Sequence, residues 1–420
     1  MRIVIAGAGI CGLTAALSLH GAGFAPVVYE AATRMTPLGV GINVLPHAVR
    51  ELADLGLLDE LRRLGVEIDE LVYLTRHGGR IWREPRGLAA GYAWPQIAVH
   101  RGALQMLLLQ ATQDRLGPDA VRFGHALVDV KSAYDATSAT FVDRSNGRTA
   151  GVVEVDLLLA ADGIHSAARR VFYPDEGPPK WNGVMLWRST SQSGMVLGGR
   201  SMLWAGHARQ KFVAYPIAFD EASGETRLNW ICDLKRGEGE APAREDWNRP
   251  GRLEDFLPSF EAWRWPGVDV PALLRASGDV FEFPMVDRDP LPRWTFGRTT
   301  LMGDAAHPMY PVGSNGATQA IIDARALAFH LATAPDVAEA LERYEADRRE
   351  ATGRIVMMNR AHGPDRVMEL AEQRAPEADD DLDALLPMAE RQAIADRYKA
   401  AAGFDPATMS ARSPYALGKG

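Results

Sequence analysis

The first thirty residues contain the pattern that most constrains the fold of this chain. Residues 3–6 form a short apolar run, and residues 13–20 have the composition and length of a helix. Residues 26–29 form a second apolar run, and a helix between two such runs returns the chain for parallel pairing. The sequence therefore predicts a strand, a helix and a parallel strand at the N-terminus of an α/β domain.

The turn between the first strand and the helix has glycine at Gly7, Gly9 and Gly12. Glycines at this spacing allow a tight turn and the close approach of a pyrophosphate, whose charge meets free N–H groups at the helix N-terminus. Glu30, at the end of the second strand, is placed to accept hydrogen bonds from a ribose diol. A plain glycine-rich turn is the alternative, and the strand–helix context favours nucleotide binding.

Composition excludes several other classes of protein. The chain has 420 residues, 47% of them hydrophobic and 24% charged, which is ordinary for a globular protein. A net charge of -8 and a pI near 5.7 give no basic surface for nucleic acid. Two cysteines, Cys11 and Cys232, cannot form a disulfide framework, which favours a reducing, cytoplasmic location. The apolar run 3–19 is broken by glycines, so neither a signal peptide nor a membrane span is expected.

The rest of the chain divides into α/β stretches around a β-rich middle. Between residues 184 and 283, short aromatic-rich runs alternate with Gly, Pro and Ser, which predicts an antiparallel sheet in a second layer. On that sheet Trp187 and Tyr215 are candidates for a substrate pocket, and Arg188 offers a cation for a carboxylate. The other expected elements are a helix over 46–64, a hairpin over 73–82, a strand over 97–99, a helix over 101–115, one continuous strand over 152–160, a strand over 299–302, a helix from 316 to about 332 and a helical tail beyond 344.

Two further motifs follow strands that are expected to be buried. Asp162-Gly163-x-x-Ser166-x-x-Arg169 fits either a cofactor loop or an ordinary helix cap. Gly303-Asp304-Ala305-Ala306-His307-Pro308 and Pro311-x-Gly313-x-Asn315-Gly316-Ala317 open a long helix, whose N-terminus can stabilise negative charge. His307 has no partner at metal-ligand spacing, so a structural role is preferred to a catalytic one, and no metal site is expected.

Taken together and in this order, the three motifs resemble those of the class A flavoprotein monooxygenases, which have the para-hydroxybenzoate hydroxylase fold. The similarity extends to the methylphenazine-carboxylate hydroxylases of pyocyanin biosynthesis. The matched stretches are residues 37–43 (PLGVGIN), 100–106 (HRGALQM), 162–169 (DGIHSAAR), 284–292 (PMVDRDPLP) and 303–317.

Residues 346–420, most of which the resemblance does not cover, are expected from their own sequence to form a helical C-terminal segment. For the rest of the chain, the resemblance implies a Rossmann-like FAD-binding domain of residues 1–75, 96–180 and 284–345 and an antiparallel substrate domain of residues 76–95 and 181–283. It places Pro311 and Gly313 in the catalytic flavin-ring loop. The implied cofactor-binding residues are Gly7, Gly9, Ile10, Gly12, Glu30, Ala31, Val40, Gly41, Arg101, Val128, Asp162, Gly163, Gly303, Asp304, Pro311, Gly313, Asn315, Gly316 and Ala317.

The activity implied by the resemblance is hydroxylation of an aromatic or heteroaromatic ring, phenazine-like in the subgroup named above. NADH or NADPH would reduce the FAD transiently, and O₂ would react through a flavin C4a-hydroperoxide. Two alternatives stay open on the sequence alone. One is a flavin-dependent reductase or dehydrogenase of the same fold, and the other is a non-catalytic flavin-binding regulator.

Overall fold

The parallel unit expected at the N-terminus is present in the computed structural model of the chain. Strands β1 (Ile3–Ala6) and β2 (Val27–Tyr29) pair in parallel and are joined by helix α1 (Ile10–Gly21). The helix begins at Ile10, directly after the glycine-rich turn. The structure describes residues 1–37, 39–133, 136–194, 197–220, 224–236, 249–407 and 409–417.

Strand β1 lies inside a six-stranded sheet with the order β20-β21-β12-β1-β2-β8. Its neighbour β12 (Leu157–Ala160) pairs with it in parallel, and both strands are buried at every residue. Such uniformly apolar strands are typical of a parallel sheet that is covered on both faces. The other strands of the sheet are β8 (Val121–Arg122), β20 (Thr295–Phe296) and β21 (Thr299–Leu301).

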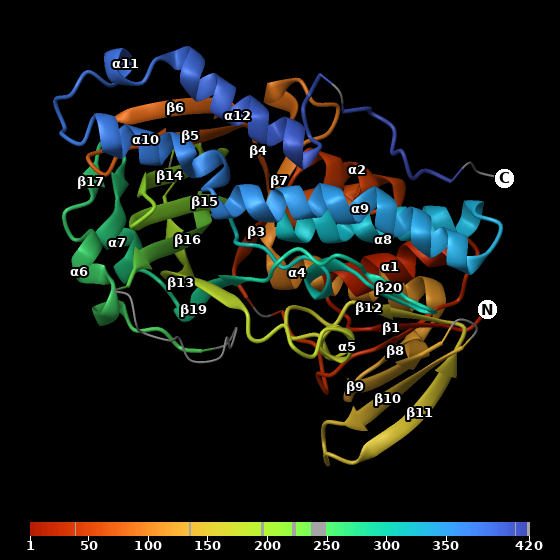
Figure 1. Cartoon of the computed structure of the whole chain (residues 1–420). Helices are drawn as coiled ribbons and strands as arrows, with labels where there is room; N and C mark the ends of the chain where they lie inside the picture. The colour runs from red at the N-terminus through yellow and green to blue at the C-terminus, as the bar shows by residue number, and fades with distance from the viewer. Residues whose placement is uncertain are drawn as a thin grey trace.

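Helices cover one face of this sheet, and a small antiparallel sheet covers the other (Figure 1). On the helical face, α1 contacts α4 (Arg101–Leu116) and α8 (Gly316–Thr333), and α9 (Val337–Arg360) lies along α8. On the opposite face, the ring of Tyr29 stacks on Phe141 with 4.3 Å between the ring centroids. The small sheet consists of β9 (His125–Ser132), β10 (Thr137–Asp143) and β11 (Thr149–Val155), and helix α5 (Ala167–Phe172) contacts β9.

Two of the expected elements are each divided in the structure. The continuous strand over residues 152–160 is wrong, because β11 ends at Val155 and β12 begins at Leu157, in a different sheet. Asp156 lies at the break and accepts a hydrogen bond from the backbone N–H of Arg2 at 2.6 Å. The helix over 46–64 is two helices, α2 (Pro46–Asp54) and α3 (Leu58–Leu64). Gly56 separates them with φ of 73°, a conformation that ends helices.

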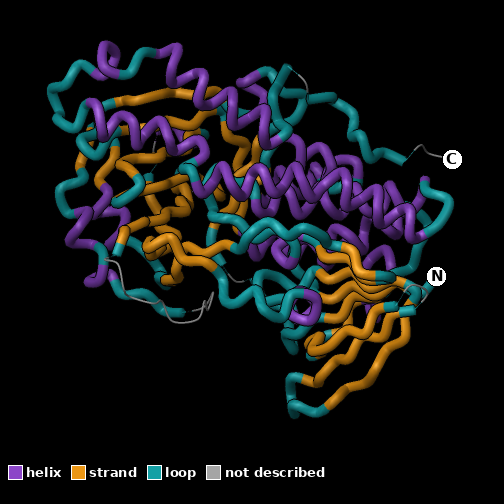
Figure 2. The backbone as a smooth tube through the Cα atoms, viewed as in Figure 1, coloured by secondary structure: helices purple, strands orange, loops and turns teal. Residues whose placement is uncertain are grey.

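The aromatic-rich middle of the chain forms most of a seven-stranded sheet with the order β19-β13-β16-β15-β14-β5-β6. All neighbours pair antiparallel except β14 and β5, which pair in parallel. Figure 2 shows its strands at the end of the molecule opposite β9, β10 and β11. The strands are β5 (Glu70–Leu74), β6 (Arg80–Pro85), β13 (Lys180–Ser193), β14 (Ser201–His207), β15 (Gln210–Asp220), β16 (Glu225–Lys235) and β19 (Phe281–Asp287).

One face of the seven-stranded sheet packs on its own hydrophobic core. Trp187 and Trp230 from the sheet meet Phe256 and Phe260 there. The elements over this face are α6 (Leu257–Phe260), α7 (Val270–Arg275), β17 (Arg264–Trp265) and β18 (Val268–Asp269). The sheet therefore turns its other face toward the rest of the molecule.

The remaining elements join the two large sheets. A three-stranded sheet of β3 (Gly41–Val44), β7 (Gln96–His100) and β4 (Gly65–Ile68) contacts β15. The C-terminal helices α10 (Arg366–Arg374), α11 (Leu382–Leu385) and α12 (Met388–Ala402) lie near β5, β6 and β14 (Figure 1). Among the described helices, none combines the length and apolar character that a bilayer span requires.

The expected division into domains remains a prediction. Strand β5, within residues 1–75, pairs with β6 in the seven-stranded sheet, and β19 crosses the expected boundary at 283/284. The six-stranded sheet draws all its strands from the segments assigned to FAD binding.

Replacing Leu159 in β12 with alanine should destabilise the protein strongly. Its side chain is completely buried, and truncation of a buried leucine typically costs about 2–5 kcal/mol. Val152→Ala in β11 is the control, because Val152 is 59% exposed and should change stability by less than about 0.5 kcal/mol. Urea unfolding followed by circular dichroism measures both, and equal losses in the two variants would contradict the assigned core.

Candidate active site

A cavity of about 390 Å³ lies between the six-stranded and seven-stranded sheets. Segments far apart in the sequence form its walls: the β1–α1 turn, the start of β3, the N-terminus of α4, the end of β12 and the loop before α8. The sequence-predicted residues that line it are Gly9, Ile10, Val40, Gly41, Arg101, Gly163, Tyr215, Asp304, Pro311, Asn315, Gly316 and Ala317.

The β1–α1 turn gives the cavity a backbone wall without side chains. A Cβ at Gly12 would lie 1.9 Å from the carbonyl oxygen of Gly7, so the helix can follow the turn this closely only with glycine there. A Cβ at Gly9 would meet nothing within 4 Å, which leaves open space beside the first turn of α1. Glu30 steadies the turn, since its carboxylate accepts from the N–H groups of Ala8 and Ala32, each at 2.7 Å.

Arg101 and Asp304 face the cavity from two different elements. Arg101 is the first residue of α4, and Asp304 lies in the short turn η5 (Gly303–Ala305). Both side chains are accessible within the cavity, and no described residue makes a hydrogen bond to either one. Burial by the surrounding protein raises the pKa of Asp304 above its ordinary value. These two side chains are free to bind a ligand.

The loop 311–317 leads into the N-terminus of α8. Asn315 is the N-cap, but its side chain makes no capping hydrogen bond, so the first N–H groups of the helix lack a side-chain partner. Gly316 and Ala317 line the cavity at this point. The free N–H groups and the helix dipole create a positive local potential, which favours negative charge on a ligand.

The motif that runs from Asp162 to Arg169 contributes both to the cavity and to the structure behind it. Asp162 accepts a hydrogen bond from the N–H of Ala167 at 2.7 Å, and Ser166 caps the same helix, α5. Burial raises the pKa of Asp162. Arg169 is fully buried and donates to the carbonyl oxygens of Ala305 and Ala306 at 3.1 and 2.9 Å. The arginine of this motif therefore holds the loop that carries Asp304.

Several sequence-predicted residues lie outside the cavity lining. Val128 is 39% exposed in strand β9. Leu38, in the matched stretch 37–43, is outside the described residues. The other predicted cofactor residues that do not line the cavity are Gly7, Gly12, Glu30, Ala31, Asp162, Gly303 and Gly313. Their proposed contacts with the cofactor stay predictions.

The expectation that Trp187 faces the substrate pocket is not met. Its ring stacks on Phe256 in the core beyond the sheet, 5.1 Å between centroids, and its indole N–H reaches Glu282 at 3.1 Å. Neighbouring strand residues point to opposite faces, and it is Arg188 that lines the cavity. The sequence predicted that Trp187 and Arg188 point to opposite faces of the sheet, but it did not show which face is turned toward the cavity.

Arg188 brings a buried positive charge to the sheet side of the cavity. One of its N–H groups donates to the carbonyl of Gly41 at 3.2 Å, and its guanidinium lies over the ring of Phe283. No carboxylate of the described residues forms a salt bridge with it. Burial lowers the pKa of Arg188, but an arginine side chain stays charged throughout the physiological pH range. Tyr215 donates to the same carbonyl at 2.8 Å, and burial raises its pKa to about 12.

The sheet wall also contains residues that sequence reasoning had not assigned to the site. Phe281 and Phe283 give it flat apolar surfaces. Lys211 forms ion pairs with Asp233 at 3.0 Å and Asp365 at 2.7 Å. The alternation of side chains along the strands would identify some of these residues if the face of the sheet that is turned toward the cavity were known. Asp365 follows Lys211 by more than 150 residues, and no local signal points to the pair.

Behind the cavity, a buried carboxylate on α8 connects the surrounding segments. Asp323 accepts from the N–H of Gly303 at 3.0 Å, from Nε2 of His307 at 2.5 Å and from Nε of Arg348 at 2.8 Å. Burial alone would raise the pKa of Asp323, but the charges of His307 and Arg348 outweigh burial and lower it. His307 therefore has a structural contact with Asp323, in line with the structural role that the sequence favoured.

Comparison with known proteins settles what this fold and cavity belong to. The family model described as FAD binding domain matches residues 1–254 and 267–359. The chain belongs to this family. Phenazine 1,6-dicarboxylic acid hydroxylase PhzS of Lysobacter antibioticus is 46% identical over 361 residues, 85% of this chain and 89% of that protein. 3-Hydroxybenzoate 6-hydroxylase 1 of Aquipseudomonas alcaligenes is 30% identical, over 86% of this chain and 88% of that protein.

Solved structures confirm the fold. A salicylate hydroxylase substrate complex superposes with a TM-score of 0.75 at 20% identity, covering 99% of this chain and 98% of that one. Klebsiella pneumoniae HpxO with FAD and uric acid gives 0.72 at 24% identity, covering 96% and 95%. The chain is an FAD-dependent aromatic monooxygenase with the para-hydroxybenzoate hydroxylase fold, as the resemblance implied, and the reductase and regulator alternatives receive no support.

The residues of the cavity fit an FAD molecule. The open backbone at Gly9 and the cation of Arg101 suit a pyrophosphate. Asp304 offers a carboxylate acceptor for hydroxyl groups, and the N-terminus of α8 suits the negative charge of a reduced flavin ring. The enzyme family uses NAD(P)H to reduce this cofactor and O₂ as the oxidant.

Arg101→Ala should weaken FAD binding while the protein stays folded. Losing a charge-assisted hydrogen bond costs about 1.5–3 kcal/mol, or roughly tenfold to more than a hundredfold in affinity. Arg115→Ala is the matched control on the same helix, because Arg115 donates to the carbonyl of Leu55 and does not line the cavity. Fluorescence titration of the apoprotein with FAD gives the dissociation constant of each variant. An unchanged dissociation constant in Arg101→Ala would show that Arg101 does not bind FAD.

Asp323→Asn should destabilise the protein by about 3–5 kcal/mol, because it leaves His307 and Arg348 without their buried counter-charge. Glu350→Gln is the control, since the Glu350–Arg354 pair is exposed and such pairs contribute at most about 1 kcal/mol. The folded-state pKa of Asp323 is lowered. The contribution of Asp323 to the free energy of unfolding is therefore complete above the ordinary carboxyl pKa of 3.8 and is lost as the pH falls below that value. Unfolding curves at several pH values test both statements.

Proposed function

We propose that this chain hydroxylates a fused aromatic heterocycle that carries a carboxylate, of the phenazine type, with NADH or NADPH and O₂. The 46% identical relative is named for a phenazine dicarboxylic acid, and the cavity combines flat walls with a buried cation that forms no salt bridge within the described residues. The observation that carries the proposal is Arg188, a guanidinium on the cavity wall without a carboxylate partner among the described residues.

Arg188 is suited to hold the carboxylate of the ring system. Burial has already removed most of its water, so a carboxylate that pairs with it restores hydrogen bonds that water would otherwise make. Its position beside Gly41 and Tyr215 fixes the guanidinium from behind. An uncharged ring would leave this cation without a counter-charge and should bind more weakly.

The flat side chains on the same wall suit the ring itself. Trp204 and Phe283 line the cavity together with Met202 and Met285. Aromatic and thioether side chains make favourable contacts with a planar ring, and they exclude water from it. Water exclusion matters because the activated oxygen must reach carbon before it is lost as peroxide.

In this arrangement the FAD supplies the electrons and the activated oxygen, and the chain positions cofactor and substrate. Gly9 and Arg101 would hold the pyrophosphate, Asp304 the ribityl hydroxyls, and loop 311–317 the edge of the flavin ring. The substrate would lie between that loop and the seven-stranded sheet. Holding two reactants in a fixed geometry is the main contribution that such a site can make.

A substrate panel tests the proposal directly. Purified enzyme with FAD, NADH or NADPH, and O₂ would receive phenazine carboxylates, unsubstituted phenazine, salicylate and aliphatic ketones in turn, with products scored by mass. The phenazine carboxylates should give a product 16 mass units heavier, or its decarboxylated form, with little free peroxide. Oxygenation of ketones alone, or NAD(P)H oxidation that yields only peroxide throughout, would refute the proposal.

Arg188→Met should raise KM for the carboxylated substrate by roughly tenfold to more than a hundredfold, since a charge-assisted hydrogen bond is lost. Trp187→Phe is the matched control. Trp187 is next to Arg188 in the sequence but lies on the opposite face of the sheet, so this substitution should leave KM within about twofold. Steady-state kinetics with a carboxylated and an uncharged phenazine measure the effect. Equal changes for both substrates would show that Arg188 does not recognise the carboxylate.

A further inference from the structure

The C-terminal helix α12 places one tyrosine directly against the loop that leads into α8. Tyr398 is 3% exposed and packs in a small core with Leu45, Ile355 and Phe404. Its hydroxyl accepts a hydrogen bond from Nδ2 of Asn315 at 3.0 Å. The same hydroxyl lies 2.8 Å from Oδ1 of Asn359 and 3.2 Å from the carbonyl oxygen of Val312, both of which can accept its proton.

The loop has a backbone that needs such outside support. Gly313 and Ser314 both have positive φ, 71° and 60°, and a serine in this region is disfavoured without stabilising contacts. A Cβ at Gly313 would lie 2.2 Å from the Tyr398 hydroxyl, so the tyrosine touches the backbone of the loop itself. The hydroxyl therefore fixes the loop through Val312 and Asn315 on either side of these two residues.

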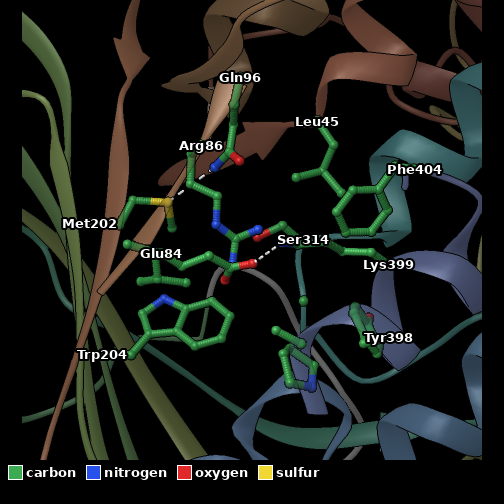
Figure 3. A pocket seen from close by; sticks show the side chains of 14 residues that line it. Leu45, Glu84, Arg86, Gln96, Met202, Trp204, Ser314, Tyr398, Lys399 and Phe404 are labelled. Carbon is green, nitrogen blue, oxygen red and sulfur yellow. Dashed lines mark hydrogen bonds and ion pairs between the residues drawn. The ribbon is translucent and has the colours of Figure 1, made fainter. Parts of the chain in front are cut away.

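The space behind the loop is small. A pocket of about 10 Å³ lies there, lined by Gly313, Ser314, Tyr398 and Lys399 among others (Figure 3). Such a volume holds about one water molecule. Helix α12 is consequently the wall on which the loop rests.

Tyr398 also belongs to a buried chain of hydrogen bonds. Asn315 accepts from Nε2 of Gln319 at 3.1 Å, and Oε1 of Gln319 accepts from Arg348 at 2.5 Å. Arg348 binds Asp323, which holds the Gly303 loop. The two loops that line the cavity beside α8 are thus linked to one another and to the C-terminal helix.

We propose that Tyr398 is a positioning residue for the flavin-ring loop, so that helix α12 is part of the cofactor site. The inference rests on the proposed placement of the flavin ring at loop 311–317. Tyr398 does not line the large cavity, and it acts through Asn315 and Val312. Removing its hydroxyl releases the loop while leaving the aromatic packing in place.

The experiment compares Tyr398→Phe with Tyr92→Phe in the full-length protein. Tyr92 packs in the same small core, and its hydroxyl donates to the carbonyl of Phe404 in the C-terminal segment; among the described residues it makes no hydrogen bond to the loop. Three properties are measured: the FAD dissociation constant, the visible spectrum and midpoint potential of the bound flavin, and the thermal unfolding of the apoprotein. None of these measurements requires a substrate, so they test the role of Tyr398 even if the proposed phenazine-type substrate is wrong.

Tyr398→Phe should raise the FAD dissociation constant about two- to tenfold, the factor that corresponds to one lost hydrogen bond. It should also shift the flavin spectrum and potential, whereas Tyr92→Phe should lower thermal stability to a similar extent without either change. Gly313→Ala, which pushes a methyl group against the hydroxyl, should weaken FAD binding at least as much. Wild-type affinity, spectrum and potential in Tyr398→Phe would overturn the proposal, as would identical flavin changes in Tyr92→Phe.

Discussion

The carboxylate of Asp323 is the interaction on which the cofactor side of this molecule depends. It lies in the middle of α8, without exposure to water, and accepts hydrogen bonds from a loop backbone, a histidine and an arginine. A buried charge of this kind is stable only if every partner stays in place. The loop at Gly303, helix α8 and helix α9 must therefore adopt their relative positions together, and the cavity takes its shape from that arrangement.

A second constraint comes from the alternation of side chains in the seven-stranded sheet. The same strand β13 sends Trp187 into the core below the sheet and Arg188 into the cavity above it. One row of side chains stabilises the sheet, and the adjacent row is free to bind a ligand. Stability and recognition are thereby separated residue by residue, so a change in one row leaves the other largely intact.

The sequence was sufficient for the features that local patterns encode. The glycine-rich turn and its flanking apolar runs predicted the parallel unit, and the three motifs predicted the family, the fold and the cofactor. Eleven of the cofactor residues implied by the resemblance to that family line one cavity, although separate segments supply them. The division at Asp156 and the face turned by Trp187 were not predictable, because both depend on which sheet a strand joins. The ion pairs of Lys211 and the contact of Tyr398 with loop 311–317 join residues whose neighbours in sequence give no hint of the partner.

The position of β1 at the centre of its sheet has a consequence for the order in which the chain can fold during synthesis. Its partner on one side, β2, follows after about twenty residues, but its partner on the other side, β12, follows only after about 150. At ribosomal rates of roughly 5–20 residues per second, that interval lasts on the order of ten to thirty seconds. Throughout it, the completely apolar strand at the N-terminus has an open edge, the kind of surface that chaperones bind. The first strand and the cavity residues that directly follow it are thus made early, but the sheet that holds them in place closes only when β12 is added.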